Sequence, residues 1–218
     1  MSNKSVSFKV GWDVSSLLVI AGTLITSWKI EPHLPARIAT HFDLFGNPNG
    51  YSSREFGTWL LPLLSLGIWA IMRFAMLAAP QSWRARMTNA PLAAATFLTV
   101  AFLSGLHLAI LNAALNGGAG LGRELAVLLG LMWIGLAVLL PRMRRNPVFG
   151  VRTAWTLSSD ENWARTHRVA SYTFFAGGIL CLGACLVSGA AAVTVAILAV
   201  IFSALIPAVY SWSIARQT

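Results

Sequence analysis

The chain contains repeated apolar stretches, each about as long as a lipid bilayer is thick. The hydrocarbon core of a bilayer measures about 30 Å, so a helix that crosses it needs roughly 20 mostly apolar residues. Of the 218 residues, 56% are hydrophobic and only 11% are charged, outside the range of soluble globular proteins. We therefore expect an all-α polytopic membrane protein, one transmembrane helical domain over residues 1–218. Its six expected transmembrane helices lie near Gly11–Lys29, Phe56–Ala79, Pro91–Leu115, Glu124–Leu140, Ala170–Gly189 and Ala191–Ile214.

The last two apolar windows are almost contiguous. Together they are too long for one crossing, and Ser188-Gly189 favours a turn between them. Within the fifth window, small residues recur at every fourth position, which places them on one ridge of a helix. We expect this ridge to let a neighbouring helix approach closely, with the cysteines acting as small apolar residues rather than as a disulfide. The ridge consists of Gly177, Cys181, Cys185 and Gly189.

The distribution of charge predicts the orientation of the helices. Lys and Arg in short loops are retained on the cytoplasmic side of a membrane. With six crossings and both termini on one face, that face carries twelve basic and three acidic residues, against four of each on the opposite face. We expect both termini in the cytoplasm (N-in/C-in) and a multi-pass protein of the cell inner membrane. The twelve basic residues are Lys4, Lys9, Arg73, Arg84, Arg86, Arg142, Arg144, Arg145, Arg152, Arg165, Arg168 and Arg216.

This assignment also explains the net charge of +9 as a signal of topology. Nucleic-acid recognition needs a folded basic surface, which short loops between apolar helices cannot build. No direct nucleic-acid partner is therefore expected.

The predicted extracytoplasmic loop, residues 30–55, is rich in proline and glycine. We expect a helical turn at Ala36–His41 and a tight turn at Asn47–Gly50, where Gly or Asn accepts a positive φ. His33, His41 and Asp43 are candidate metal ligands, but their spacing matches no known ligand pattern. We expect a structural histidine here, with no metal and no cofactor.

The predicted cytoplasmic loop, residues 141–168, is called the signature loop below. Asn146-Pro147 should end any helix that continues from Pro141, because the residue before a proline disfavours the α conformation. Gly150 allows a close turn, after which residues 151–153 should be extended. Ser158 and Glu161 have the spacing of a capping box, which predicts a helix that starts near Ser159 and continues into the fifth window.

Two tryptophans of the signature loop, Trp155 and Trp163, suit the headgroup region, where an apolar ring with one polar N–H is favoured. Two interpretations of the loop remain open from its residues. It is either an anchored helix entry with positive-inside arginines or an element that binds a partner.

Polar residues inside the apolar windows provide a second candidate site. Such residues are costly in lipid and tend to face the interior of a bundle. His107 and Asn112 lie in the outer half of the third window, and Glu124 begins the fourth. The three are either a proton-sensitive or ligand-contacting pocket or simple hydrogen-bonding partners of neighbouring helices.

The two loops together resemble a known family. The order Asn-Pro, Phe-Gly-Val-Arg-Thr, Trp-Thr-Leu-Ser-Ser, an acidic residue, Trp163 and Thr166-His167-Arg168 is similar to the signature of the SdpI family of bacterial integral membrane proteins. The 30–55 loop, with Leu34-Pro35, Ile38, His41-Phe42, Gly46 and Gly50-Tyr51, resembles the domain of unknown function found towards the N-terminus of these proteins. One departure is Ala154, where the family usually has proline.

The resemblance implies a binding protein and not an enzyme. The namesake of the family protects a bacterium from its own secreted toxin peptide and draws a cytosolic repressor to the membrane. The implied partners are the lipid bilayer, a toxin peptide at the outer face and a cytosolic repressor at the inner face. The positions that carry the family pattern are Asn146, Pro147, Gly150, Arg152, Thr153, Trp155, Thr156, Ser158, Ser159 and Trp163, with Pro35, His41 and Gly46 in the other loop.

A second function class is a small transporter or lipid-associated membrane protein that uses the bundle interior. Transporters are often built from internal repeats with broken helices at matching positions. Pro62 and Pro207 do not occupy equivalent positions in two opposed halves, and no internal repeat is evident. An intramembrane hydrolase is the weakest alternative, because the histidines form no HExxH-like pair.

Overall fold

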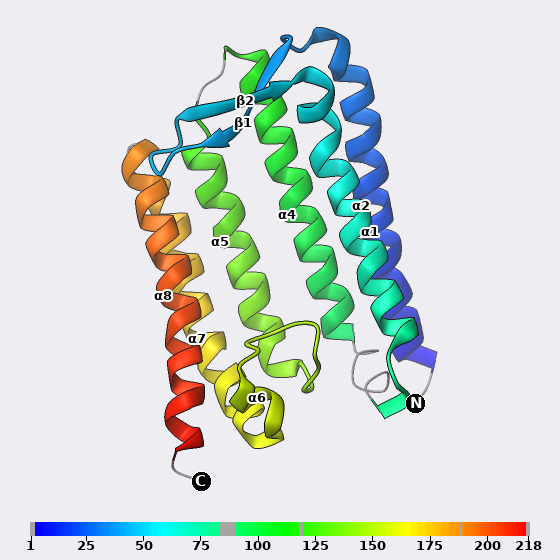
Figure 1. Ribbon diagram of the computed structural model, residues 1–218, viewed down its shortest axis with the longest axis vertical. Coiled ribbons are helices and arrows are strands. Elements are labelled where there is room, and N and C mark those ends of the chain that lie inside the picture. Colours follow the sequence, from blue (N-terminus) through cyan, green and yellow to red (C-terminus); the bar gives the residue numbers. More distant parts are fainter. Residues whose placement is uncertain (1–2, 83–89, 118–119, 188, 217–218) are drawn as a thin grey trace.

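The protein is a bundle of long helices in which each helix runs opposite to the next one along the chain (Figure 1). The computed structural model describes residues 3–82, 90–117, 120–187 and 189–216. Three expectations fall on residues outside these ranges: the basic residues Arg84 and Arg86 and the turn residue Ser188. The long helices are α1 (Asn3–Ile30), α2 (Arg54–Ala78), α4 (Ala90–Leu115), α5 (Gly122–Leu139), α7 (Asp160–Ala184) and α8 (Gly189–Ala215). The all-α polytopic fold predicted from the apolar windows is confirmed.

Five of the long helices are apolar and long enough to cross a bilayer within the described residues: Gly11–His33, Arg54–Ala75, Ala90–Leu115, Gly122–Arg142 and Ala191–Ala215. The remaining helix, α7, begins with polar residues and becomes apolar only from Ala170. It nevertheless runs beside α8, so that α1 begins and α8 ends at the same end of the bundle (Figure 1). A sixth crossing and the N-in/C-in orientation stay predictions.

The helices pack as two three-helix units. In the first, α1, α2 and α4 contact one another, and in the second α5, α7 and α8 do so. The helices α4 and α5 join the units. Within the second unit, a Cβ on Gly178 would lie 2.9 Å from the carbonyl oxygen of Gly130, so α5 and α7 cross where neither has a side chain. This close approach of helices at small residues is typical of membrane bundles.

The predicted small-residue ridge faces two neighbours. A Cβ on Gly177 would lie 3.2 Å from the carbonyl oxygen of Ala199 on α8, and the Cys181 thiol points to the carbonyl oxygen of Ala196 at 3.7 Å. The Cys185 thiol contacts the carbonyl oxygen of Arg123 on α5 instead, at 3.8 Å. Both cysteines are free thiols.

The loop between α1 and α2 folds differently from expectation. After a short 3-10 helix, η1 (Glu31–His33), it forms an antiparallel hairpin of β1 (Arg37–Phe42) and β2 (Pro48–Ser53). The helical turn expected at Ala36–His41 is therefore wrong, because Ile, Thr and Phe favour a strand once a partner strand is present. The tight turn lies at residues 43–47 rather than Asn47–Gly50, and Gly46 supplies the positive φ of 79°.

The signature loop also begins and ends its helices differently. The helix α5 ends at Leu139 and is followed by a 3-10 helix, η2 (Leu140–Arg142), so the chain has left the helix before Asn146-Pro147. The expected α7 start near Ser159 is confirmed, with the Ser159 side chain accepting from the Asn162 N–H. The capping box lies earlier, between Thr153 and Thr156, and opens a short helix, α6 (Ala154–Ser158), that was not predicted.

Candidate functional site

The hairpin, residues 37–53, covers the end of the bundle opposite to the chain termini (Figure 1). Its Ile38 side chain is 1% exposed and packs with Ile110 and Leu111 of α4 and with Leu121, just before α5. A Cβ on Gly57 of α2 would lie 3.0 Å from Ile38 Cβ, so the absence of a side chain there lets β1 approach α2. The hairpin is thereby anchored to both three-helix units.

Gly46 attaches the turn of the hairpin to the second unit. A Cβ at this position would meet Val193 of α8 at 3.0 Å and the backbone of Gly122 at 3.4 Å. In addition, a Cβ on Gly120 would lie 2.8 Å from the Gly46 carbonyl oxygen, which accepts from the Leu121 N–H at 3.4 Å. The glycine at this family position therefore serves both the turn conformation and the close packing of backbones.

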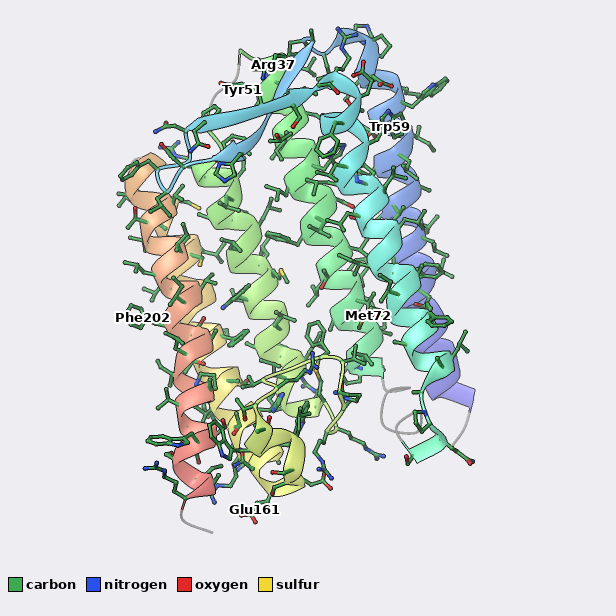
Figure 2. The ribbon with its side chains drawn as sticks, viewed as in Figure 1. Arg37, Tyr51, Trp59, Met72, Glu161 and Phe202 are labelled. Carbon is green, nitrogen blue, oxygen red and sulfur yellow. The ribbon has the colours of Figure 1, made fainter. Side chains whose placement is uncertain are left out.

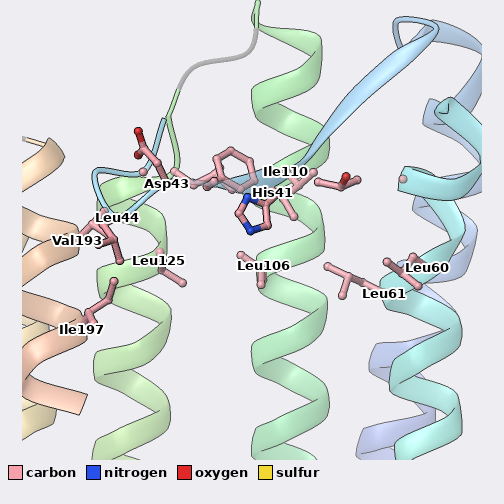
Figure 3. Close-up of a pocket in the computed structure, with 15 residues that line it drawn as sticks. His41, Asp43, Leu44, Leu60, Leu61, Leu106, Ile110, Leu125, Val193 and Ile197 are labelled. Atoms are coloured by element: carbon pink, nitrogen blue, oxygen red, sulfur yellow. The ribbon is translucent and has the colours of Figure 1, made fainter. Parts of the chain in front are cut away.

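A cavity of about 360 Å³ lies beneath the hairpin, between the two units. Leu60 and Leu61 of α2 and Leu106 and Ile110 of α4 line one wall (Figure 3). The other wall is formed by Leu121 and Leu125 near the start of α5 and by Val193 and Ile197 of α8. The cavity combines apolar walls with a few polar groups at one edge, as small-molecule and side-chain binding sites commonly do.

The polar edge of the cavity belongs to the hairpin. The His41 ring projects from β1 into the cavity, above Leu106 of α4 (Figure 3). Its Nδ1 lies 2.5 Å from Asn49 Oδ1 on β2, so a side-chain hydrogen bond within the hairpin holds the ring. Asp43 accepts hydrogen bonds from the backbone N–H groups of Asn47 and Phe45, and these bonds hold the pKa of its carboxyl below the ordinary value. Asp43 is therefore ionised at neutral pH.

Pro35, the remaining family position of this loop, is exposed. Its carbonyl oxygen accepts from Arg54 Nε at 3.4 Å, and the backbone N–H of Arg54 donates to the carbonyl oxygen of Ala36 at 3.0 Å. The proline thus marks the point where the chain leaves η1 and closes the base of the hairpin.

At the other end of the bundle, Asn146 organises the start of the signature loop. Its side chain is 2% exposed, and its Oδ1 accepts from the N–H groups of Val148 and Phe149 at 2.9 and 2.8 Å. Its Nδ2 donates to the carbonyl oxygens of Arg144 and Phe149. One amide side chain therefore satisfies four backbone groups in a segment without regular secondary structure, and Pro147 beside it is exposed.

Gly150, Trp163 and His167 hold the loop against α7. His167 Nε2 accepts from the Val151 N–H at 3.1 Å, so Nδ1 carries the ring proton and donates to the Trp163 carbonyl oxygen at 2.8 Å. The two rings stack with centroids 4.0 Å apart. A Cβ on Gly150, whose φ is 117°, would collide with the His167 ring. The headgroup position expected for Trp163 is wrong: it is 2% exposed and donates to the Met143 carbonyl oxygen at 2.9 Å.

Thr153 and Thr156 form the capping box of α6 and connect it to α8. Thr153 Oγ1 accepts from the Thr156 N–H, and Thr156 Oγ1 accepts from the Thr153 N–H. Thr153 Oγ1 also lies 2.9 Å from Ser211 Oγ on α8. Asn162 of α7 donates to the Ser211 carbonyl oxygen at 2.9 Å. Ser211 of α8 therefore contacts both the cap of the short helix α6 and the first turn of the long helix α7.

Exposure separates the signature residues into two groups. Asn146, Thr156 and Trp163 are buried. Arg152, Trp155 and Ser158 are exposed, and the headgroup position expected for Trp155 stays a prediction. A small groove of about 220 Å³ beside α6 contains Trp155, Ser158, Glu161 and Arg165 in its lining. The exposed residues are the part of the signature loop that a partner can reach.

The three polar residues proposed as an intramembrane cluster occupy different surroundings. His107 is fully buried, and its Nε2 lies 2.7 Å from Ser27 Oγ on α1. Asn112 and Glu124 are exposed, and Asn112 interacts with Asn116 of its own helix. Within the described part of the chain no hydrogen bond joins the three. The partner that sequence reasoning missed is Ser27, which lies inside an apolar window without a distinguishing pattern.

Another polar contact between helices was also missed. Arg73 of α2 and Asp13 of α1 form an ion pair at 2.9 Å, and Trp69 Nε1 lies 3.4 Å from the same Asp13 oxygen. A basic and an acidic residue in facing windows are the signal that could have identified it. Among the described residues, no three His, Cys, Asp or Glu side chains are grouped as a metal site would require.

Two protein-family models match the chain, one over the signature loop and one over the hairpin. Residues 142–211 match the SdpI/YfhL protein family, and residues 18–66 match a domain of unknown function, DUF1648. The first match contains the signature loop from Arg142 onward, α7 and most of α8, and the second contains the hairpin. The family predicted from the residues of the two loops is therefore confirmed. No curated protein and no solved structure matches the chain.

Proposed function

We propose that this membrane protein of the SdpI type confers immunity to a membrane-active toxin peptide and relays the presence of that peptide to a cytosolic regulator. The observation that supports the proposal is the apolar cavity beneath the hairpin, which is lined by both three-helix units. Membrane-active peptides present large apolar side chains from one face and basic residues from the other. A laterally accessible apolar cavity suits such a ligand.

The relay part of the proposal rests on the opposite end of the bundle. The signature loop is held by buried hydrogen bonds, yet it exposes Arg152 and Trp155. Arginine and tryptophan are the residue types that contribute most to protein interfaces. Their exposure on a rigid loop suits recognition of a protein partner. We further propose that the protein lies in the cytoplasmic membrane of a bacterium with this loop inside.

Expression of the chain in a sensitive bacterium tests the proposal. Cells are challenged with candidate membrane-active peptides, and survival is compared between wild type, Arg152→Ala and Trp155→Ala at equal protein abundance. Arg144→Ala is the matched control, because Arg144 is an exposed arginine of the same loop outside the family pattern. We expect wild type and Arg144→Ala to protect equally, and Arg152→Ala and Trp155→Ala to protect less.

Two outcomes would contradict the proposal. If the wild-type chain protects against none of the peptides, the immunity function has no support. If Arg152→Ala and Trp155→Ala protect as well as wild type and co-purify the same cytosolic proteins, the signature loop is not the relay.

A further inference from the structure

The cavity beneath the hairpin is open to the side of the bundle. Two residues of its lining are well exposed, Leu44 at 67% in the hairpin turn and Leu60 at 40% on α2. Because Leu44 lies in the hairpin turn and Leu60 near the start of α2, a ligand reaches the cavity from the interface of the membrane without passing through the bundle. The cavity is large enough for a bulky side chain and is lined mainly by Leu, Ile and Val.

The charges around the cavity favour one kind of ligand. Among the described residues that line it, Asp43 is the only carboxylate, and no lysine or arginine is present. The Asp43 carboxylate lies at the outer rim of the cavity and points away from the helices (Figure 3), and its Oδ1 accepts from the backbone N–H groups of Phe45 and Asn47. An anionic lipid headgroup would find no counter-charge in this lining, whereas a basic group next to an apolar chain would find one.

We infer that the cavity beneath the hairpin binds a large apolar side chain of a basic amphipathic peptide, with a basic residue of the peptide held near Asp43. This inference rests on the proposed function and specifies its binding site. The apolar side chain contacts Leu61 and Leu106 of the first unit and Ile197 of the second. Because the walls come from different units, a bound peptide bridges them.

The experiment uses the full chain in nanodiscs of phosphatidylcholine, whose zwitterionic headgroups do not attract basic peptides. The probe is a synthetic Lys/Leu amphipathic peptide with one benzoylphenylalanine on its apolar face. A matched peptide carries Glu in place of Lys. The yield of crosslinked product is measured against peptide concentration and gives the affinity. Mass spectrometry locates the crosslinked residues. We expect crosslinks on the cavity walls and at least tenfold weaker binding of the Glu peptide.

Filling the cavity provides the decisive variants. Ile197→Trp occupies the space and should weaken binding by about tenfold or more, since burial of one large apolar side chain is lost. The matched control is Ile201→Trp, one turn further along α8 at a position that is 44% exposed. Asp43→Asn retains the side-chain acceptor of the turn and should reduce the difference between the Lys and Glu peptides.

A second pair of variants tests the same cavity from α2. If Ile197→Trp does not fold, Leu61→Phe fills the cavity from α2, and Leu63→Phe, at a 54% exposed position, is its control. Equal binding by the cavity-filling and control variants would overturn the inference, as would equal binding of the Lys and Glu peptides. A photoactivatable fatty acid that labels the cavity walls and is not displaced by the Lys peptide would identify a lipid site instead.

The inference and the proposed function fail in different ways. If the Lys peptide crosslinks to the cavity but the chain protects no cells, the immunity function is wrong and the binding site stands. If Ile197→Trp protects cells as well as wild type, immunity does not use this cavity.

Discussion

Single side chains of the signature loop have two different tasks, and exposure distinguishes them. Asn146, Trp163 and His167 are buried and satisfy backbone groups of a segment that has little regular secondary structure. A buried polar backbone group without a partner costs free energy, so these side chains determine the shape of the loop. Arg152 and Trp155 are exposed on that shape. Substitutions in the first group should therefore change stability, and substitutions in the second should change binding.

Replacement of Asn146 tests the structural group. Asn146→Ala leaves the N–H groups of Val148 and Phe149 without their acceptor, so we expect the free energy of unfolding to fall by about 2 kcal/mol. Arg152→Ala, at an exposed position, should change it by less than about 0.5 kcal/mol. Thermal unfolding in detergent measures both. Equal melting temperatures for the two variants would show that Asn146 does not organise the loop.

Ala154 stands where the family usually has proline. It is the first residue of α6, directly after the cap Thr153. Proline is favoured at the first position of a helix, where the backbone N–H has no partner within the helix and φ already suits the ring. The usual family proline and the alanine of this chain are therefore both compatible with the loop.

We expect Ala154→Pro to stabilise the protein by about 0.4–1 kcal/mol, because it reduces the conformational freedom of the unfolded chain. The corresponding variant at Trp155, one residue further into α6, should be destabilising. Melting temperatures of Ala154→Pro and Trp155→Pro provide the comparison. A loss of stability in Ala154→Pro would show that α6 does not begin at Ala154.

At the scale of elements, the second three-helix unit depends on glycines that bring backbones together. Gly178 faces Gly130 and Ile134 of α5, with no room for a side chain. Gly183, on the same helix, has no atom within 4 Å of its would-be Cβ. The two positions are nearly indistinguishable in the sequence, and only the packing separates them.

Alanine at these two glycines should have opposite effects. Gly178→Ala forces α5 and α7 apart and should cost about 1–3 kcal/mol of stability. Gly183→Ala should leave stability unchanged or raise it slightly, because alanine favours a helix over glycine. Thermal unfolding of both variants in the same detergent tests the pair. A similar effect at both positions would contradict the described crossing of α5 and α7.

At the scale of the whole molecule, the two loops are bridges between the three-helix units. The hairpin packs on α4 through Ile38 and on α8 through Gly46. The signature loop does the same at the other end through Phe149, which packs with Leu92 of α4 and with the core around Trp163 of α7. Phe202, in the middle of α8, instead faces outward (Figure 2) and is 57% exposed. Three residues of the family pattern, Ile38, Gly46 and Phe149, thus lie where the two units are joined.

At the scale of the whole molecule, we predict that the hairpin and the turn between α7 and α8 lie outside the cell and the signature loop inside. Single cysteines are introduced into a chain in which Cys181 and Cys185 are replaced by alanine. An impermeant maleimide applied to intact cells should label Phe45→Cys in the hairpin turn and Leu186→Cys between α7 and α8, which are 56% and 89% exposed. Arg144→Cys in the signature loop should react only after the membrane is permeabilised. If Leu186→Cys instead reacts together with Arg144→Cys, α7 does not cross the membrane.

The apolar windows were sufficient to predict the helices, because a helix in lipid satisfies every backbone hydrogen bond within its own segment. The order of residues in the two loops was likewise sufficient to identify the family. The hairpin was not predicted, because the strand pairing of Arg37 with Ser53 joins distant residues and short runs such as residues 37–42 are compatible with helix or strand. The cavity, the burial of Trp163 beside the exposed Trp155, and the partner of His107 follow from the packing of helices that are far apart in the chain. Such contacts leave no local pattern, so only the tertiary structure decided them.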